Sequence, residues 1–180
     1  ELMQALLQGT LPDGTQLGRI DKEGIHHRSG FDMTVSAPNS FSTLLESGAD
    51  PRLGEVFDKT VEWFVSEVEN ELAQARIMVD GKIDYVDTKK FVVAAFRQPN
   101  SRANDPQSHV HLVVMNMTPC PDGKWRSLAS DMQAERGVVE QIMKNHIYLG
   151  LKFRNKLANF TKELGYTLET TGDGLWEIKG

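Results

Sequence analysis

The sequence predicts an α+β fold, with a mostly antiparallel central sheet and helices packed on it. Three observations carry this prediction. Residues 52–76 place apolar side chains at helical spacing over many turns. Asp80-Gly81 separates two strand-like runs and is the strongest short hairpin signal in the chain. Two apolar, β-branched runs at 91–96 and 109–116 are expected to pair as central strands of one sheet.

The first part of the chain is expected to hold one helix and one strand. Helical spacing of apolar residues favours a helix over 2–8, and a polar loop with a Pro-Asp-Gly turn at 12–14 follows it. Residues 31–36 predict a strand, because polar and apolar side chains alternate there. Its polar face carries Asp32, Thr34 and Ser36.

The middle of the chain predicts a long helix followed by a hairpin. Asp50-Pro51 is a strong helix start, since proline is favoured at the first helical position. The amphipathic pattern runs from Arg52 to about Arg76. Strands are expected at 75–79 and 82–86.

A polar loop over 97–108 is expected to join the strand at 91–96 to the strand that begins at His109. Further along, a small strand is expected at 125–128. A helical pattern then runs from Ala134 to Leu164 and ends at a glycine, as many helices do. A last hairpin is expected from 166–169 and 175–178, around Gly172-Asp173-Gly174.

Composition limits the kind of protein. The 180 residues are expected to form a single domain, and no apolar run approaches the ~20 residues that a membrane span requires. The start lacks the pattern of a signal peptide and resembles the start of a fragment. Cys120 is the only cysteine, which excludes an internal disulfide and a thiolate-rich zinc site, and fits the cytoplasm. The net charge of -5 argues weakly against coating of duplex DNA through the overall field.

Two histidines open the run at 109–116. On a strand, His109 and His111 project from the same face, while Val110 and Leu112 face the other way. Such a pair can hold a divalent cation when further ligands come from elsewhere in the fold. The alternative is that both histidines only form hydrogen bonds at a strand end.

Five blocks of sequence carry a resemblance to a known family. They read LPDG at 11–14, HRSGFDMTVSAPNS at 27–40, SR at 101–102, PQSHVH at 106–111 and KWRSL at 124–128. Together they resemble the relaxase domain of conjugative plasmid-transfer proteins of the TraI and TrwC type, over nearly all of the chain. The resemblance implies the two-layer sandwich of HUH nucleases.

The resemblance implies an enzyme that nicks one DNA strand at an origin of transfer, through a tyrosine that becomes joined to the 5′ end. It also implies a three-histidine metal centre that polarises the scissile phosphate. His109 and His111 match two of these ligands, whereas Gln98 stands where the family usually has the third histidine. A glutamine oxygen is a poorer ligand than imidazole for borderline metals, so Mg²⁺ or Mn²⁺ is favoured, with Zn²⁺ and Ni²⁺ as alternatives.

Asp32 matches the family's acidic residue beside the nucleophile, which implies a role as general base or as the group that orients one. Without the resemblance, an aspartate that caps a turn or pairs with Arg28 would be favoured. The family's catalytic tyrosines lie upstream of the segment that matches Glu1, so we expect residues 1–180 to be a relaxase-like domain without its tyrosine segment. Tyr85, Tyr148 and Tyr166 are interpreted as packing residues with a polar tip.

The family also implies recognition of single-stranded and hairpin DNA at an origin of transfer, with other conjugative DNA-processing proteins as partners. We expect a monomer in the bacterial cytoplasm with no membrane contact. Trp125 could stack on a base or pack at the edge of the fold. Candidate DNA contacts are Arg28, Arg102, Lys124, Arg126, His146 and Arg154.

Two other functions stay open. The first is a non-catalytic single-stranded DNA-binding module with a degenerate metal site, which the glutamine at 98 favours. The second is a metal hydrolase that uses water as nucleophile. That reading is disfavoured because the sequence has no second carboxylate cluster for a two-metal site.

Overall fold

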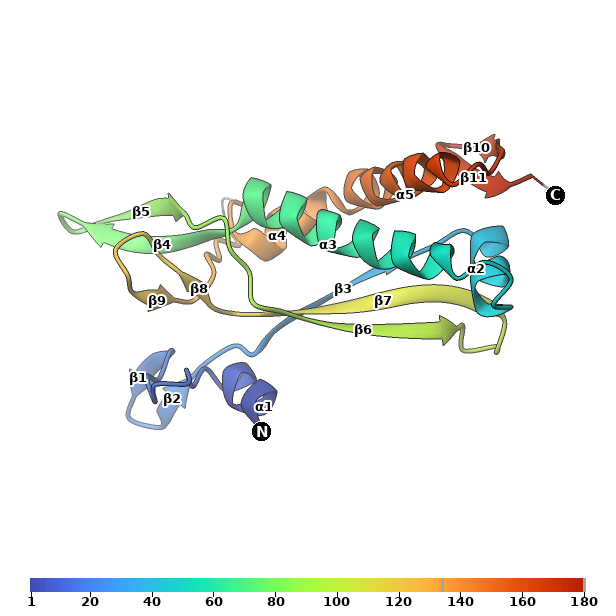
Figure 1. Cartoon of the computed structure of the whole chain (residues 1–180). Coiled ribbons are helices and arrows are strands. Elements are labelled where there is room, and N and C mark those ends of the chain that lie inside the picture. Colours follow the sequence, from blue (N-terminus) through green and yellow to red (C-terminus); the bar gives the residue numbers. More distant parts are fainter. Residues whose placement is uncertain (134, 180) are drawn as a thin grey trace. The chain divides into compact units, whose positions relative to one another are not determined.

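The structure is a computed structural model that describes residues 1–133 and 135–179, and Figure 1 shows its elements along the chain. The chain divides into two compact units. The first unit comprises Glu1–Met33, Glu67–Ala94 and Val113–Lys144. The second unit comprises Thr34–Ser66, Ala95–Leu112 and Asn145–Gly180.

A three-stranded sheet in the order β3-β7-β6 confirms that the two predicted strands pair, but it places β6 at the edge of the described sheet rather than at its centre. Its strands are β3 (Gly30–Ser36), β7 (Pro106–Met115) and β6 (Val93–Asn100). The histidine strand β7 is therefore the middle strand, with β3 and β6 on either side.

Strands β3 and β7 run antiparallel, as backbone hydrogen bonds near their two ends show. Near the start of β3, the Asn116 N–H donates to the Ser29 carbonyl at 3.1 Å. Just past the end of β3, the Ala37 N–H donates to the Ser108 carbonyl at 2.9 Å. Residue numbers rise on one strand as they fall on the other, which is the antiparallel arrangement that the sequence predicts.

The predicted polar loop over 97–108 is wrong in extent, because β6 continues to Asn100 and β7 already begins at Pro106. Only the short turn between them is irregular, and it closes with a hydrogen bond of 2.9 Å from the Ser101 N–H to the Asp105 carbonyl. Polar side chains on an exposed sheet face have the same composition as a loop, so sequence pattern could not separate the two. The consequence is that Gln98 lies on a strand.

Side chains on β7 alternate as predicted. Val110, Leu112 and Val114 are buried on one face, whereas His109 and His111 are half-buried on the other. The polar face of the sheet in the second unit is therefore the more open one.

Helices cover the apolar side of the sheet in the second unit. Helix α2 (Asn39–Glu46) was not predicted, although Phe41, Leu44 and Leu45 stand at helical spacing within its eight residues. The hairpin β10-β11 is confirmed. The elements are α2 (Asn39–Glu46), the part of α3 (Arg52–Leu72) up to Ser66, α5 (His146–Glu163), β10 (Leu168–Gly172) and β11 (Leu175–Ile178).

A cluster of aromatic rings forms the core of the second unit. Phe57 lies 6.1 Å from Phe41 and 6.1 Å from Phe153, measured between ring centroids. Phe153 packs edge-on against Phe64 at 5.6 Å, and Phe41 packs edge-on against Trp176 at 6.4 Å. Full burial of each phenylalanine contributes about 1.5–3 kcal/mol, so this cluster holds α2, α3, α5 and β11 together.

Helix α3 begins where Asp50-Pro51 predicts. Asp50 Oδ1 accepts the backbone N–H of Arg52 at 3.0 Å, and Oδ2 lies 2.7 Å from Arg52 Nη2. The Tyr166 hydroxyl donates to Oδ2 at 3.0 Å. The helix ends at Leu72 rather than near Arg76, because residues from Gln74 onward pair with the strand β5 (Lys82–Asp87).

Replacing Asp50 tests this helix start. Hydrogen bonds and the positive charge of Arg52 hold the pKa of Asp50 well below its ordinary value of 3.8. A depressed carboxyl pKa stabilises the fold above the unfolded value, and that stabilisation is lost as pH falls through the folded value. We expect Asp50→Asn to lower the free energy of unfolding by a constant amount above about pH 5, with the difference shrinking below about pH 4. Urea titrations of both proteins across pH measure this; a difference that stays unchanged down to pH 2 would contradict it.

The first unit has a small apolar core of its own. Leu11, Leu17, Met115 and Met117 are buried together, and side chains from α1 pack against them. Strands β1, β2 and β8 were not predicted, because two- and three-residue strands leave no periodic signal. The elements are α1 (Leu2–Leu7), β1 (Arg19–Asp21), β2 (Gly24–His26), β4 (Gln74–Val79), β5 (Lys82–Asp87), β8 (Thr118–Pro119), β9 (Trp125–Arg126) and α4 (Val138–Lys144).

The predicted helix over 134–164 is two helices. Its expected start at Ala134 lies outside the described residues, and α4 ends at Lys144 before α5 begins at His146. Asn145 between them has φ −104° and ψ 12°, outside the helical region. Both helices are apolar on one side, so the spacing pattern hides the break.

Gly30, at the start of β3, lies against the backbone of β7. Its φ is +151°, and a Cβ placed there would overlap the carbonyl oxygen of Val114.

Among the described residues, no helix is both long and apolar enough to cross a membrane.

Candidate metal centre and basic hollow

A polar hollow of about 500 Å³ lies on the open face of the sheet in the second unit. All three strands and the β6-β7 turn contribute to it. Its lining brings together four residues selected from the sequence, His109, His111, Gln98 and Arg102. The other lining residues are Thr34, Ser36, Asn100, Ser101 and Gln107.

The two histidine rings lie side by side in this hollow. Their centroids are 5.2 Å apart and their planes meet at 69°. His109 Nδ1 lies 2.8 Å from the Gln107 carbonyl oxygen, which can only accept, so Nδ1 carries the proton. A neutral imidazole held in this way coordinates a metal through Nε2.

His111 has a comparable partner on the neighbouring strand. Its Nδ1 lies 3.2 Å from the Thr34 hydroxyl oxygen on β3. Sequence reasoning placed Thr34 on the polar face of its strand but gave it no role. Strand β3 lies beside β7, which brings Thr34 to His111. The sequence pattern could not predict this strand order.

Gln98 reaches the same hollow from β6, on the other side of β7. Within residues 1–133 and 135–179, no group of three histidine, cysteine, aspartate or glutamate side chains is arranged to hold a metal ion. The donors that the hollow offers are therefore two imidazoles and neutral oxygens from amides and hydroxyls. This set fits a divalent cation that completes its coordination with water or substrate.

Asp32 is exposed on β3, on the same face as Thr34 and two residues before it. It belongs to the first unit and does not line the hollow.

A second hollow, of about 460 Å³, lies in the first unit and is strongly basic. It brings together Arg28 and Arg126, which were selected from the sequence, with Arg19 and Arg76, which were not. Within the part of the chain that the structure describes, the lining contains no carboxylate. These four arginines come from distant segments, so only the folded chain shows that they converge.

Two features of the basic hollow set its chemistry. Arg126 holds Asp122 through two hydrogen bonds of 2.8 and 2.6 Å, which keeps the pKa of Asp122 below its ordinary value. His27 lines the hollow with both ring nitrogens buried and without a hydrogen-bond partner in the described structure, and burial lowers the pKa of His27. Arg126 is thus already paired with a carboxylate, and the guanidinium groups that the hollow can offer to an anion are those of Arg19, Arg28 and Arg76.

The remaining candidates lie elsewhere. Lys124 and Trp125 are exposed beside and on β9. His146 begins α5 and is exposed, whereas Arg154 is half-buried on the same helix. None of these four lines either hollow.

Tyr85 and Tyr166 are half-buried with a hydrogen-bonded hydroxyl, as the sequence predicted, whereas the predicted packing of Tyr148 is wrong because its side chain is exposed. The Tyr85 hydroxyl donates to Asp131 at 2.6 Å, and the Tyr166 hydroxyl donates to Asp50. The contact with Asp131 raises the pKa of Tyr85, and burial together with the contact with Asp50 raises the pKa of Tyr166, which opposes activation of either phenol as a nucleophile. Tyr148 is exposed, with the ammonium of Lys152 5.8 Å from its ring centroid.

The fold and the first hollow define an α+β protein that carries an imidazole pair on the open face of an antiparallel sheet. The family model described as TrwC relaxase matches residues 1–180. The chain belongs to the TrwC relaxase family.

Relatives of known function agree with this assignment. The chain is 39% identical over 181 residues to the multifunctional conjugation protein TraI of Escherichia coli K12, covering 100% of this chain and 10% of that protein. It is similar to TrwC complexed with a 27-mer DNA of the recognition hairpin and cleavage site, with a TM-score of 0.83, 32% identity, and coverage of 97% of this chain and 59% of that one. It is also similar to a metal-bound TrwC complex with oriT DNA, with a TM-score of 0.83 and 31% identity. That match covers 98% of this chain and 58% of the TrwC chain. The chain therefore spans only part of each relative.

Proposed function

We propose that this chain is the metal-holding part of a relaxase that nicks one DNA strand at an origin of transfer. The observation that carries the proposal is the convergence of His109, His111 and Gln98 in one hollow. The family supports it, since a TrwC relaxase has been described both with oriT DNA and with metal.

In this proposal the protein's own side chains prepare the metal site. The Gln107 carbonyl fixes the proton of His109 on Nδ1, which leaves Nε2 of His109 to coordinate. The Thr34 hydroxyl contacts Nδ1 of His111, and in this proposal it accepts the Nδ1 proton so that Nε2 of His111 also coordinates. Gln98 adds its amide oxygen. A bound divalent ion would stabilise charge on the oxygens of the scissile phosphate.

The nucleophile in this proposal is a tyrosine upstream of Glu1. Its hydroxyl oxygen forms a bond to phosphorus as the bond from phosphorus to the 3′ oxygen breaks, which leaves the 5′ end on the tyrosine. Asp32 accepts the phenolic proton or orients the group that does, and the departing 3′ oxygen takes up a proton. Arg102, in the same hollow as the histidines, is suited to holding a phosphate oxygen.

We further propose that the DNA also contacts the basic hollow. Arg28 lies there together with Arg19 and Arg76, and guanidinium groups hold phosphates in pairs of hydrogen bonds. Arg126 lies there too, and in this proposal it exchanges its contact with Asp122 for one with DNA. Lys124, His146 and Arg154 remain proposed contacts outside both hollows. The proposed substrate is single-stranded and hairpin DNA at an origin of transfer, and the proposed partners are other conjugative DNA-processing proteins. The proposed chain is monomeric, works in the bacterial cytoplasm and uses Mg²⁺ or Mn²⁺.

One observation favours a second function. Only two of the three expected ligands are imidazoles, and the third is a neutral amide. A chain with this donor set could bind single-stranded DNA without supporting cleavage.

Calorimetric titration of Mn²⁺ and Mg²⁺ into the chain separates the two functions. We expect Mn²⁺ to bind at micromolar concentration, about 8 kcal/mol of binding free energy. Gln98→His should tighten Mn²⁺ binding by roughly tenfold or more, because imidazole is the stronger ligand for this ion. His26→Ala is the control, since His26 lies in the first unit and pairs with Asp21. Binding that appears only in Gln98→His would instead support the non-catalytic module.

A further inference from the structure

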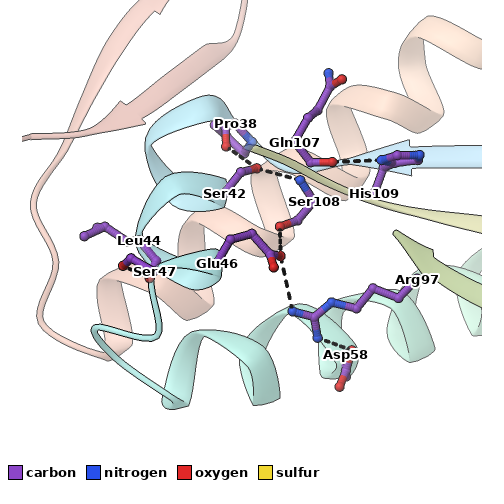
Figure 2. A network of polar contacts seen from close by, with 10 residues as sticks. All are labelled: Pro38, Ser42, Leu44, Glu46, Ser47, Asp58, Arg97, Gln107, Ser108 and His109. Atoms are coloured by element: carbon purple, nitrogen blue, oxygen red, sulfur yellow. Dashed lines mark hydrogen bonds and ion pairs between the residues drawn. The ribbon is translucent and has the colours of Figure 1, made fainter. Parts of the chain in front are cut away.

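On the strand that carries the histidines, a buried serine that faces the helices fixes the backbone to α2 (Figure 2). Ser108 is fully buried and directly precedes His109. Its hydroxyl donates to Glu46 Oε1 at 2.6 Å, and its N–H donates to the Ser42 hydroxyl at 3.0 Å. The backbone that carries His109 is thereby tied to two residues of one helix.

The same carboxylate also reaches the strand that carries Gln98. Arg97 directly precedes Gln98, and its Nη2 lies 3.9 Å from Glu46 Oε1 (Figure 2). The guanidinium also lies 3.4 Å from Asp58 Oδ1 and 5.3 Å from the centroid of the Phe57 ring. Glu46 is thus the only one of these acceptors that contacts both strands.

Alternation along the strands separates this contact from the hollow. Because successive side chains point to opposite faces, Ser108 and Arg97 face the helices while His109 and Gln98 line the open face. A change at Glu46 can therefore shift the backbone under both ligand candidates without removing an atom from the hollow.

The position of Glu46 in its own helix supports a role outside that helix. Glu46 is the last residue of α2, where the helix dipole disfavours negative charge. Its carboxylate is 26% exposed and therefore partly withdrawn from water. The contacts with Ser108 and Arg97 offset both costs.

We propose that Glu46 is a positioning residue that sets the spacing of His109 on β7 and Gln98 on β6. This inference rests on the proposed metal-holding function, since a spacing of ligands matters only where they share an ion. The alternative is that Glu46 merely fastens α2 to the sheet.

The test measures Mn²⁺ affinity and the His109 tautomer in Glu46→Ala, Glu46→Gln and Asp58→Ala. We expect Glu46→Ala to weaken Mn²⁺ binding by roughly tenfold, as loss of groups that orient ligands does. Glu46→Gln keeps an oxygen that accepts from Ser108 and should restore most of the affinity. Asp58→Ala is the matched control, because it removes a carboxylate from Arg97 alone and should change the affinity less than about twofold.

The tautomer gives a readout that needs no metal. Nitrogen NMR of the metal-free protein at mildly alkaline pH should show His109 protonated on Nδ1, with a shift toward Nε2 protonation in Glu46→Ala. Unchanged affinity and an unchanged tautomer in a folded Glu46→Ala would overturn the proposal. If the wild-type chain binds no Mn²⁺, the proposed metal function fails, and the tautomer alone still decides whether Glu46 positions His109. Should Glu46→Ala not fold, Ser108→Ala removes the same hydroxyl contact and is expected to shift both readouts in the same direction.

Discussion

Removing one histidine is expected to abolish the metal site. His109→Ala should weaken Mn²⁺ binding ~100-fold or more, because it removes an imidazole whose orientation the Gln107 carbonyl already fixes. His111→Ala should have a similar effect. In the full-length protein, cleavage of an origin oligonucleotide should fall by ~10²–10³-fold, the scale of losing one group that stabilises developing charge.

Graded variants make this expectation specific. Thr34→Ala leaves both imidazoles and removes only the hydroxyl that contacts His111 Nδ1, so we expect a loss of affinity of roughly tenfold. His26→Ala should bind Mn²⁺ with the affinity of the wild type. Calorimetry measures the affinities, and gel separation of a labelled oligonucleotide measures cleavage. Full Mn²⁺ affinity in His109→Ala would show that the histidine pair does not hold the ion.

Gly30→Ala is expected to cause the largest loss of stability in the first unit. Alanine at φ +151° is strained, and its Cβ would overlap the Val114 carbonyl oxygen on β7. Backbone oxygen cannot rotate away as a side chain can, so β3 and β7 must separate locally. We expect the free energy of unfolding to fall by about 3 kcal/mol, the sum of backbone strain and overpacking. Urea denaturation monitored by circular dichroism measures this.

Gly24→Ala is the matched control for Gly30→Ala. Gly24 has φ +127°, but a Cβ there would meet nothing within 4 Å. The control therefore carries the cost of the backbone conformation without the overlap, and it should destabilise the protein by only about 1 kcal/mol. Equal losses in the two variants would mean that contact with Val114 contributes nothing.

Sequence pattern predicted those parts of the fold where one local signal decides the structure. Asp50-Pro51 located the start of α3, Asp80-Gly81 located the hairpin β4-β5, and alternation after His109 located β7. Sequence pattern gave wrong predictions where pairing with a distant segment determines the structure. Residues near Arg76 continue the helical spacing, yet the backbone there pairs with β5.

The candidate site divides in the same way. His109 and His111 share a face because they lie two residues apart on one strand. The sequence alone predicts this arrangement. Gln98 was predicted as a metal ligand only through the family resemblance. Its position in the hollow depends on β6 extending to Asn100. Thr34 and Arg76 could not be selected, because strand order and the fold of the first unit bring them to their partners.

The residues described as lining the histidine hollow include no carboxylate, which has a consequence for how the proposed ligands assemble. Two neutral imidazoles and an amide leave the charge of a divalent ion uncompensated by the protein. A phosphate would supply the missing negative charge, so ion and DNA would each raise the affinity of the other by the same factor. The proposed centre would therefore bind Mn²⁺ weakly in the absence of DNA and more tightly when DNA is bound. Mn²⁺ titrations with and without oligonucleotide measure this difference directly.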